Sequence, residues 1–323
     1  MNIFLTGGSG FVGQHVIRYL KQQGHDIQAL VRSETAAIKV KKLGVAPILD
    51  ALTSPGDHTE RALANCEAVV HIAAHMDFTY DPTPFYQVNV EATKQLIDLS
   101  KKAGVKHFVY ISAAPVVPGS PVINLTEDEA TNALPKSLYP KTKAIAERAV
   151  LAANSTGFRT ISLRPPAVWG PQNHHYEMLF DNVKNGKWRW IGGSQQVLST
   201  IHVKNLAGAI ESALQSNIGG EAFFVTDEDN RPMRITFQSI LEAYDLEPGE
   251  KELPRGIAVF MAHLFGGLWK LLKLKSRPPV APLMIRLMAT EFSVSDEKAH
   301  RLLGYRPVIS FEEGIRELKN SQS

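Results

Sequence analysis

The amino-acid sequence predicts an α/β fold built on a doubly wound parallel sheet. From residue 1 to about 165, short apolar runs alternate with helical patterns. Continuous apolar runs of this kind are typical of parallel strands buried on both faces. The first run leads into a glycine-rich turn that opens a helix, the usual start of such a sheet. The expected strands are Ile3–Leu5, Ile27–Val31, Val45–Leu49, Ala68–Ala73, His107–Ile111 and Thr160–Leu163, and the expected helices lie near 12–22, 34–43, 57–65, 84–103 and 139–155.

Composition narrows the class of protein. The chain has 323 residues, 44% hydrophobic and 21% charged, which permits a sizeable core and argues against disorder. The net charge of +3 is too small to indicate a nucleic-acid partner. Cys66 is the only cysteine, so we expect a packing role for it and a reducing, cytoplasmic location. No signal peptide is expected, and no Cys/His cluster has zinc spacing, so no metal is expected.

The turn from Gly7 to Gly13 has the spacing G-x-x-G-x-x-G. Gly7 permits a tight turn, Gly10 lets the backbone approach a pyrophosphate, and Gly13 lets helix and strand pack closely. The helix start offers free N–H groups and a positive dipole end to phosphates. An unliganded turn is the alternative. The expected phosphate-binding residues also include Ser9, Phe11 and Val12.

The strand ends that follow carry further candidates for a dinucleotide. Arg32 stands where a site for NAD usually has an acid, and its guanidinium suits a 2′-phosphate, so NADP(H) is favoured over NAD(H). Asp50, followed by Ala51, ends the third strand and either accepts from adenine or is an ordinary turn acid. The small pair Ala73 and Ala74 lets a dinucleotide lie against the backbone.

Three polar residues near the fourth strand have different interpretations. His71 falls within the apolar strand and is read as a hydrogen-bonded core histidine. His75 follows that strand and is a weaker candidate for a substrate contact. Asn89 lies inside an expected helix despite its poor propensity, which indicates a structural or site role.

Tyr139 and Lys143 open the helix near 139–155 and lie on one helix face. A nearby cation stabilises a phenolate and lowers its pKa. Tyr139 is therefore expected to exchange a proton with a carbonyl or alcohol oxygen while hydride passes at the carbon. Lys143 is also expected to hold the nicotinamide ribose. An exposed helix pair is the alternative.

These motifs resemble the extended short-chain dehydrogenase/reductases, the NAD(P)-dependent epimerase/dehydratase group, and within it the 3β-hydroxysteroid dehydrogenase-like branch. The resemblance implies a Rossmann-type domain that binds NAD(P), with Tyr139 as acid/base beside Lys143. It implies that Pro166, Ala167 and Val168 line the nicotinamide end, and that homodimers form through helices near 84–103 and 139–155. Trp169 is a candidate for a substrate contact. The residues that carry the resemblance are Thr6–Gly13, Val69–Ala74, Val88–Thr93, Tyr139–Lys143, Leu163–Pro171, Ser199–Val203 and Leu303–Pro307.

One position departs from the family pattern. The resemblance places a Ser or Thr at the end of the fifth strand, where this chain has Ala113. Ser112 precedes it, and strand alternation points that side chain to the other face. One alternative is that another group replaces the hydroxyl of the usual Ser or Thr: His75, Ser112 after a local bend, or a water. The other is that catalysis is weak or absent.

Beyond residue 170 the alternation stops. Residues 1–170, with 200–228 returning to the sheet, are expected to form the dinucleotide domain, and 171–199 and 229–323 a smaller, mainly helical substrate-binding cap. Helices are expected near 174–185, 204–216, 235–245, 255–274, 280–290 and 296–303.

The segment 256–278 combines bulky apolar residues with lysines. It is read as an amphipathic cap helix with a solvated basic end, or as an apolar lid or peripheral membrane contact. The second interpretation favours an apolar substrate.

Three hypotheses for function remain. The first is an NADP(H)-dependent ketone reductase or alcohol dehydrogenase acting on a small hydrophobic 3-hydroxy/3-keto or sterol-like compound. The second is a nucleotide-sugar epimerase or dehydratase, which needs phosphate-binding arginines such as Arg231, Arg234 or Arg255. The third is a non-catalytic NADP(H)-binding sensor or interaction protein, suggested by Ala113.

Overall fold

A computed structural model gives the structure of the chain, and it describes residues 1–130, 133–276, 278 and 282–322. Arg277 and the start of the helix expected near 280–290 lie outside these residues. Among the helices of the described part, none is long and apolar enough to cross a membrane.

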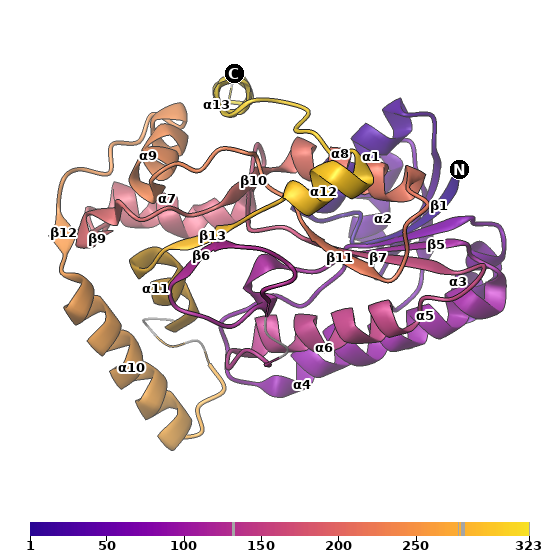
Figure 1. Cartoon of the computed structure of the whole chain (residues 1–323), viewed down its shortest axis with the longest axis horizontal. Coiled ribbons are helices and arrows are strands. Elements are labelled where there is room, and N and C mark those ends of the chain that lie inside the picture. The colour runs from indigo at the N-terminus through magenta and orange to yellow at the C-terminus, as the bar shows by residue number, and fades with distance from the viewer. Residues whose placement is uncertain (131–132, 277, 279–281, 323) are drawn as a thin grey trace.

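The centre of the molecule is a seven-stranded, all-parallel sheet with strand order β11-β7-β5-β4-β1-β2-β3 (Figure 1). This confirms the predicted Rossmann-type fold class, and the strand expected near Phe223 does return to the sheet edge. The strands are β1 (Asn2–Thr6), β2 (Asp26–Val31), β3 (Ala46–Leu49), β4 (Ala68–His71), β5 (His107–Ile111), β7 (Arg159–Arg164) and β11 (Glu221–Phe224).

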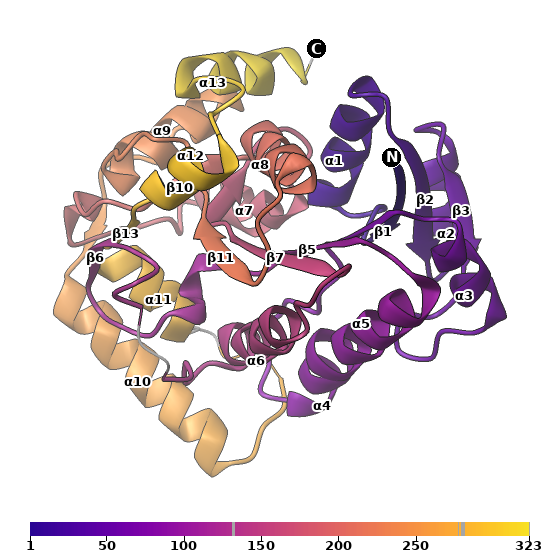
Figure 2. The ribbon, with the colours of Figure 1, turned by 45° about the vertical axis from the view of Figure 1, so that its right-hand side comes forward.

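Helices cover both faces of the sheet, which explains why its strands are continuously apolar (Figure 2). One face packs against α1 (Phe11–Gln22), α2 (Glu34–Lys41) and α8 (Val203–Gln215). The other packs against α3 (Asp57–Ala64), α5 (Ala92–Ala103) and α6 (Leu138–Ala152). Cys66 is buried in this second layer, as expected, and burial raises the pKa of its thiol to about 11.

The helix expected near 84–103 is divided. It consists of α4 (Pro82–Phe85), a π-helical turn η1 (Tyr86–Glu91), and α5. Asn89 lies in the π turn, 1% exposed, and its side chain bonds elsewhere in the chain. Wider turns of this kind occur often at functional sites.

The second half forms the other end of the molecule, with helices where the sequence predicts them and one that it missed. They are α7 (Glu177–Lys184), α9 (Met233–Ala243), α10 (Arg255–Leu271), α11 (Pro282–Ala289), α12 (Glu297–Leu303) and the unpredicted α13 (Phe311–Asn320). Three small parallel sheets were also missed. They pair β8 (Ala167–Trp169) with β10 (Thr200–His202), β9 (Trp190–Ile191) with β12 (Glu252–Leu253), and β6 (Val122–Leu125) with β13 (Phe292–Val294).

Candidate active site

The turn between β1 and α1 has the geometry of a phosphate cradle. Gly7 has a φ of +77°, and a Cβ there would lie 2.8 Å from the backbone nitrogen of Ala73. A Cβ on Gly13 would lie 2.1 Å from the carbonyl oxygen of Gly7, so only glycine allows this approach. Gly10 is exposed, precedes α1 without a side-chain cap, and would bring a Cβ no closer than 3.4 Å to its neighbours. The bare, positive helix start therefore faces open space and fits a pyrophosphate.

Three further residues of this turn differ in exposure. Ser9 and Val12 are half-buried. Phe11 is buried, and its ring lies edge-on to that of His15 at 5.6 Å. What Phe11 offers a ligand is thus its backbone N–H in the first turn of α1.

A buried chain of hydrogen bonds starts beneath the cradle. Ala73 donates its N–H to Thr6 Oγ1 at 3.1 Å, and this oxygen lies 2.6 Å from His71 Nδ1. His71 Nε2 lies 2.9 Å from Thr93 Oγ1, which donates to the carbonyl of Asn89. Burial lowers the pKa of His71 to about 3, so the ring is neutral. This confirms the core-histidine interpretation.

The carboxyl ends of β2 and β3 carry the other predicted cofactor residues. Arg32 is exposed, and no hydrogen bond or ion pair holds its guanidinium among the described residues. The Asp50 carboxylate accepts from the N–H groups of Ala51 and Gly56, both at 2.8 Å, and from the Thr59 hydroxyl at 2.7 Å. These bonds match the turn-acid alternative for Asp50, and an adenine contact stays a prediction. Ala51 and Ala73 are half-buried, and Ala74 is exposed.

Tyr139 and Lys143 lie on the first turns of α6, at the carboxyl end of β5. The side chain of Lys143 is 1% exposed. Its Nζ donates to the carbonyl oxygen of Ile111 at 2.5 Å and lies 4.0 Å from the ring centre of Tyr110. Tyr139 is half-buried and packs against the apolar cluster that contains Ala113. Tyr139 and Lys143 therefore lie at the edge formed by the carboxyl ends of the strands, which is also where the glycine turn lies.

Burial dominates the titration of this pair. It raises the pKa of Tyr139 to about 12. It lowers the pKa of Lys143 to about 7, and the Glu147 carboxylate one turn further along α6 opposes this lowering. The structure therefore shows the opposite of the expected lowering for Tyr139, because burial disfavours the charged phenolate. At neutral pH the phenol keeps its proton.

Ala113, at the end of β5, occupies the position where the family pattern has Ser or Thr. Ala113 is buried, and Ser112 is 3% exposed with its N–H donated to the carbonyl of Leu163 at 2.8 Å. The Ser112 hydroxyl is enclosed and has no hydrogen-bond partner in the described part of the chain. A local bend is needed before this hydroxyl reaches a substrate, so its catalytic role stays a prediction.

The loop after β7 borders the same edge. Ala114 donates its N–H to the carbonyl of Pro165 at 2.8 Å, which joins this loop to the end of β5. Pro166 is buried, whereas Ala167 is exposed and Val168 half-buried. Ala167 and Val168 thus present surface to a ligand, in line with the resemblance.

Trp169 has a different position from its neighbours. It is 2% exposed, its indole N–H donates to Asp227 at 2.6 Å, and its ring packs against His202 and Phe311. A Cβ on Gly314 would lie 2.5 Å from this ring. Trp169 is therefore a packing residue in this structure, and no contact supports its expected substrate role.

Asn89 joins the loop after β4 to the helix of the Tyr–Lys pair. Its Oδ1 accepts from the His75 N–H at 2.7 Å, and its Nδ2 donates to the His75 carbonyl and to Thr142 Oγ1, both at 3.0 Å. The His75 ring lies edge-on to Phe85 at 4.6 Å, and its Nε2 is buried without a partner in the described residues. Asn89 thus has a structural role, while the substrate role of His75 stays a prediction.

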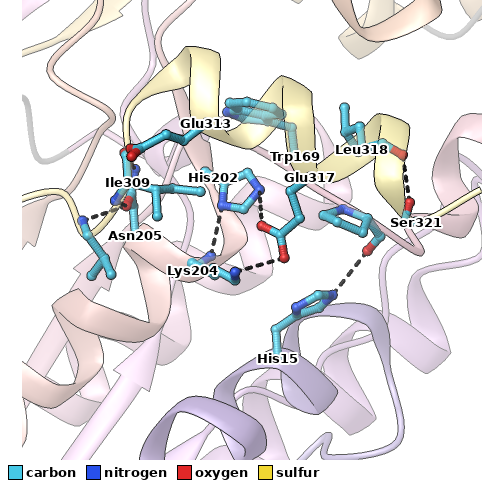
Figure 3. Close-up of polar contacts among 12 residues, drawn as sticks. His15, Trp169, His202, Lys204, Asn205, Ile309, Glu313, Glu317, Leu318 and Ser321 are labelled. Atoms are coloured by element: carbon cyan, nitrogen blue, oxygen red, sulfur yellow. Dashed lines mark hydrogen bonds and ion pairs between the residues drawn. The ribbon is translucent and has the colours of Figure 1, made fainter. Parts of the chain in front are cut away.

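A second polar cluster joins α8 to α13 (Figure 3). His202 Nδ1 accepts from the N–H of Lys204 at 3.3 Å and so caps α8. Glu317 on α13 lies 2.8 Å from Lys204 Nζ and 3.8 Å from His202 Nε2. Asn205 accepts from the N–H of Ile309 at 2.9 Å. His202 and Asn205 therefore have structural roles in this cluster.

Sequence reasoning missed Asp227 and α13. The half-buried Asp227 accepts bonds from Trp169, Thr200, Asn205 and the N–H of His202. The Ser310–Glu313 capping box at the start of α13 was the available signal for that helix.

The sheet topology, the bare start of α1 and the buried pair on α6 together define a nicotinamide-dinucleotide-dependent oxidoreductase of the extended short-chain dehydrogenase/reductase class. The chain belongs to the 3-beta hydroxysteroid dehydrogenase/isomerase family, whose model matches residues 4–255. The family resemblance seen in the sequence is thereby confirmed.

Curated relatives match nearly end to end. A 4-hydroxy-2-methyl-3-oxo-4-farnesyl-3,4-dihydroquinoline-1-oxide ketoreductase of Stigmatella aurantiaca is 32% identical over 99% of this chain and 96% of its own. A decarboxylating sterol-4-alpha-carboxylate 3-dehydrogenase of Dictyostelium discoideum is 31% identical over 98% and 99%. A 2-alkyl-3-oxoalkanoate reductase of Stenotrophomonas maltophilia is 31% identical over the full length of both chains.

Solved structures with this fold are more distant in sequence. The crystal structure of gox2253 has a TM-score of 0.79 at 22% identity and covers 99% of this chain and 97% of its own. The Thermus thermophilus UDP-glucose 4-epimerase complex with NAD has a TM-score of 0.76, also at 22% identity, and covers 99% and 98%. At this identity the likeness shows the fold alone.

Proposed function

We propose that this protein is an NADPH-dependent ketoreductase acting on a hydrophobic 3-keto compound, with Tyr139 as the proton donor. The observation that carries the proposal is the neutral phenol of Tyr139 beside the buried Lys143 at the dinucleotide edge of the sheet. The names of the relatives support it, since they include ketoreductases of farnesylated and alkyl substrates and sterol 3-dehydrogenases.

Each step belongs to a particular group. A bound nicotinamide cofactor supplies the hydride that the carbonyl carbon receives. Tyr139 donates its proton to the carbonyl oxygen, which becomes the alcohol. Lys143 is held by the Ile111 carbonyl one helix turn from Tyr139, and in its protonated form it eases loss of that proton. The raised pKa of Tyr139 keeps the phenol protonated before reaction, as a proton donor must be.

The preference for NADPH rests on Arg32. Its guanidinium is exposed at the end of β2 and has no carboxylate partner in the described structure, so it is available to a 2′-phosphate. The glycine turn and the bare start of α1 hold the pyrophosphate of either dinucleotide equally.

Two of the three arginines named for the nucleotide-sugar alternative are already paired with carboxylates, whereas Arg255 is exposed. Arg231 pairs with Asp229 and Glu312, both at 2.5 Å, and lies over the Phe311 ring. Arg234 pairs with two further carboxylates. Arginines that are already neutralised are poor ligands for a diphosphate, so the pairing of Arg231 and Arg234 supports the proposal of a hydrophobic 3-keto substrate.

NADPH oxidation with 3-oxo lipids and 3-ketosteroids tests the proposal. We expect turnover by the native protein and a loss of kcat of about 100-fold or more in Tyr139→Phe, with cofactor binding retained. Tyr19→Phe, on the side of α1 that packs near Gly208, is the matched control and keeps activity. Binding of NADPH without turnover of any ketone would instead support the sensor hypothesis. Turnover of UDP-sugars would support the epimerase.

A further inference from the structure

One face of α10 exposes bulky apolar side chains. Phe260 is 65% exposed and Leu271 is 79% exposed. The exposed positions recur every three or four residues and so form one helix face. We define the apolar face of α10 by Ile257, Phe260, Leu264, Leu268 and Leu271.

The opposite side of α10 packs against the protein through small residues. Ala258, Ala262 and Gly266 are buried there. A Cβ on Gly266 would lie 2.9 Å from the Pro282 side chain on α11 and 3.2 Å from the Tyr80 hydroxyl. An ordinary cap helix buries its bulky side, and α10 does the reverse. The solvated cap-helix interpretation of this segment therefore does not account for it, and an apolar patch of this kind marks an interaction surface.

The helix lies at the periphery of the molecule. Both views show α10 as an outer rod that is flanked by α11 on its inner side (Figures 1 and 2). The apolar face of α10 is thus accessible to a large, flat partner.

Charge decides which partner fits. Residues 255–276 contain four basic residues and no acidic one. Lys270 and Lys273 are exposed without an ionic partner in the described structure, and Lys275 pairs with Asp81 at 3.3 Å. An anionic surface complements both the lysines and the apolar face.

We propose that the apolar face of α10 docks on the surface of an anionic lipid bilayer, with the helix lying in the interfacial plane. Bulky apolar residues with clustered lysines are the composition of helices that bind in this way.

This docking also connects to the active site. Tyr80 donates its N–H to the carbonyl of Lys275 at 3.0 Å, so the end of the helix region is tied to the loop that follows β4. That loop includes His75, whose backbone is held by the Asn89 side chain. Docking therefore positions one border of the active site next to the bilayer. The docking proposal does not depend on the proposed reaction.

Flotation of the full-length protein with vesicles tests the proposal. Vesicles of phosphatidylcholine alone are compared with vesicles that also contain phosphatidylserine. We expect binding to the anionic vesicles. Phe260→Ser/Leu264→Ser lowers the partition coefficient by on the order of 10-fold or more. Lys270→Gln/Lys273→Gln lowers it by on the order of 10-fold, on anionic vesicles only.

The control is Ile123→Ser, because Ile123 is exposed on β6 and lies outside α10. This variant floats like the native protein. Circular dichroism and thermal melts check that every variant stays folded. The proposal is overturned if the native protein does not float with anionic vesicles, or if Phe260→Ser/Leu264→Ser floats equally well. A concentration-dependent dimer that this double variant abolishes would assign the face to a second copy and also overturn the proposal.

Discussion

Alanine substitutions at Gly10 and Gly13 are expected to have different effects, although both lie in the same short turn. The first should lower the affinity for NADPH, and the second should lower the free energy of unfolding. At Gly13, the Gly7 oxygen would have to retreat by about 1.3 Å to reach the 3.4 Å spacing found at Gly10. The Gly7 oxygen belongs to the backbone, and the backbone of residue 13 fixes the position of the added Cβ. Neither atom can therefore rotate away. Overpacking of this kind costs about 1–3 kcal/mol or more, against a gain of at most about 1 kcal/mol in helix propensity. We expect Gly13→Ala to lower the free energy of unfolding by about 2 kcal/mol.

Gly10→Ala has the opposite profile. The new methyl group meets no protein atom closer than 3.4 Å, so stability falls by less than about 1 kcal/mol, the cost of a poorer helix start. The methyl group does fill the space through which phosphates approach the start of α1. We expect the Kd for NADPH to rise by about 10-fold or more, because the pyrophosphate loses backbone N–H bonds.

Urea denaturation and NADPH titration measure the two effects independently. Gly24→Ala is the control, since Gly24 has a positive φ but no atom within 4 Å of an added Cβ, and it lies at the far end of α1. Its expected effect is backbone strain of about 1 kcal/mol with unchanged NADPH affinity. The reasoning is refuted if Gly13→Ala is as stable as the native protein, or if Gly10→Ala binds NADPH with native affinity.

Three other substitutions test separate parts of the site. Arg32→Glu is expected to reverse the cofactor preference: kcat/KM with NADPH falls by about 10-fold or more, and kcat/KM with NADH is unchanged. If the ratio of the two kcat/KM values stays the same, Arg32 does not bind the 2′-phosphate. The pKa of His71 in the folded protein is about 3, below its ordinary value. Between this value and about 6.5 the unfolded chain binds a proton that the folded protein does not. The free energy of unfolding therefore falls as the pH drops from about 6.5 towards 3, by up to about 1.4 kcal/mol per pH unit. His71→Gln should therefore show a shallower loss of unfolding free energy between these pH values, and an identical slope would contradict the neutral buried ring. Asp227→Ala leaves four donors without their acceptor and should cost about 3 kcal/mol or more in urea unfolding, while Glu228→Ala, next to it, should cost little.

The main sheet was predictable because its strands carry a local signal. Each strand is a continuous apolar run, and helices on both faces make this pattern necessary. The small sheets lack such a signal. The pair β9 and β12 has two residues in each strand, and β6 and β13 lie about 170 positions apart in the sequence. Their pairing depends on tertiary packing, which sequence periodicity does not encode.

The candidate site shows the same division. Gly7, Gly13, Tyr139 and Lys143 were found because their spacing reflects backbone geometry that is local in sequence. The pKa of Tyr139 was misjudged because desolvation depends on residues that only the folded chain brings around the phenol. Similarly, Asp227 is one of three consecutive acids, with Glu228 and Asp229, and the nearby sequence does not predict the four donors that converge on it.

The pairing of distant segments sets the order in which the chain can fold during synthesis. The sheet lacks its last strand until Phe224 has left the ribosome, and the Tyr305 hydroxyl then bonds the carbonyl of Thr226 just beyond that strand. Trp169 stays uncovered until Gly314 arrives with α13. A nascent chain that has not yet made α13 therefore leaves the Trp169 ring without this cover, and such exposed apolar surface favours aggregation.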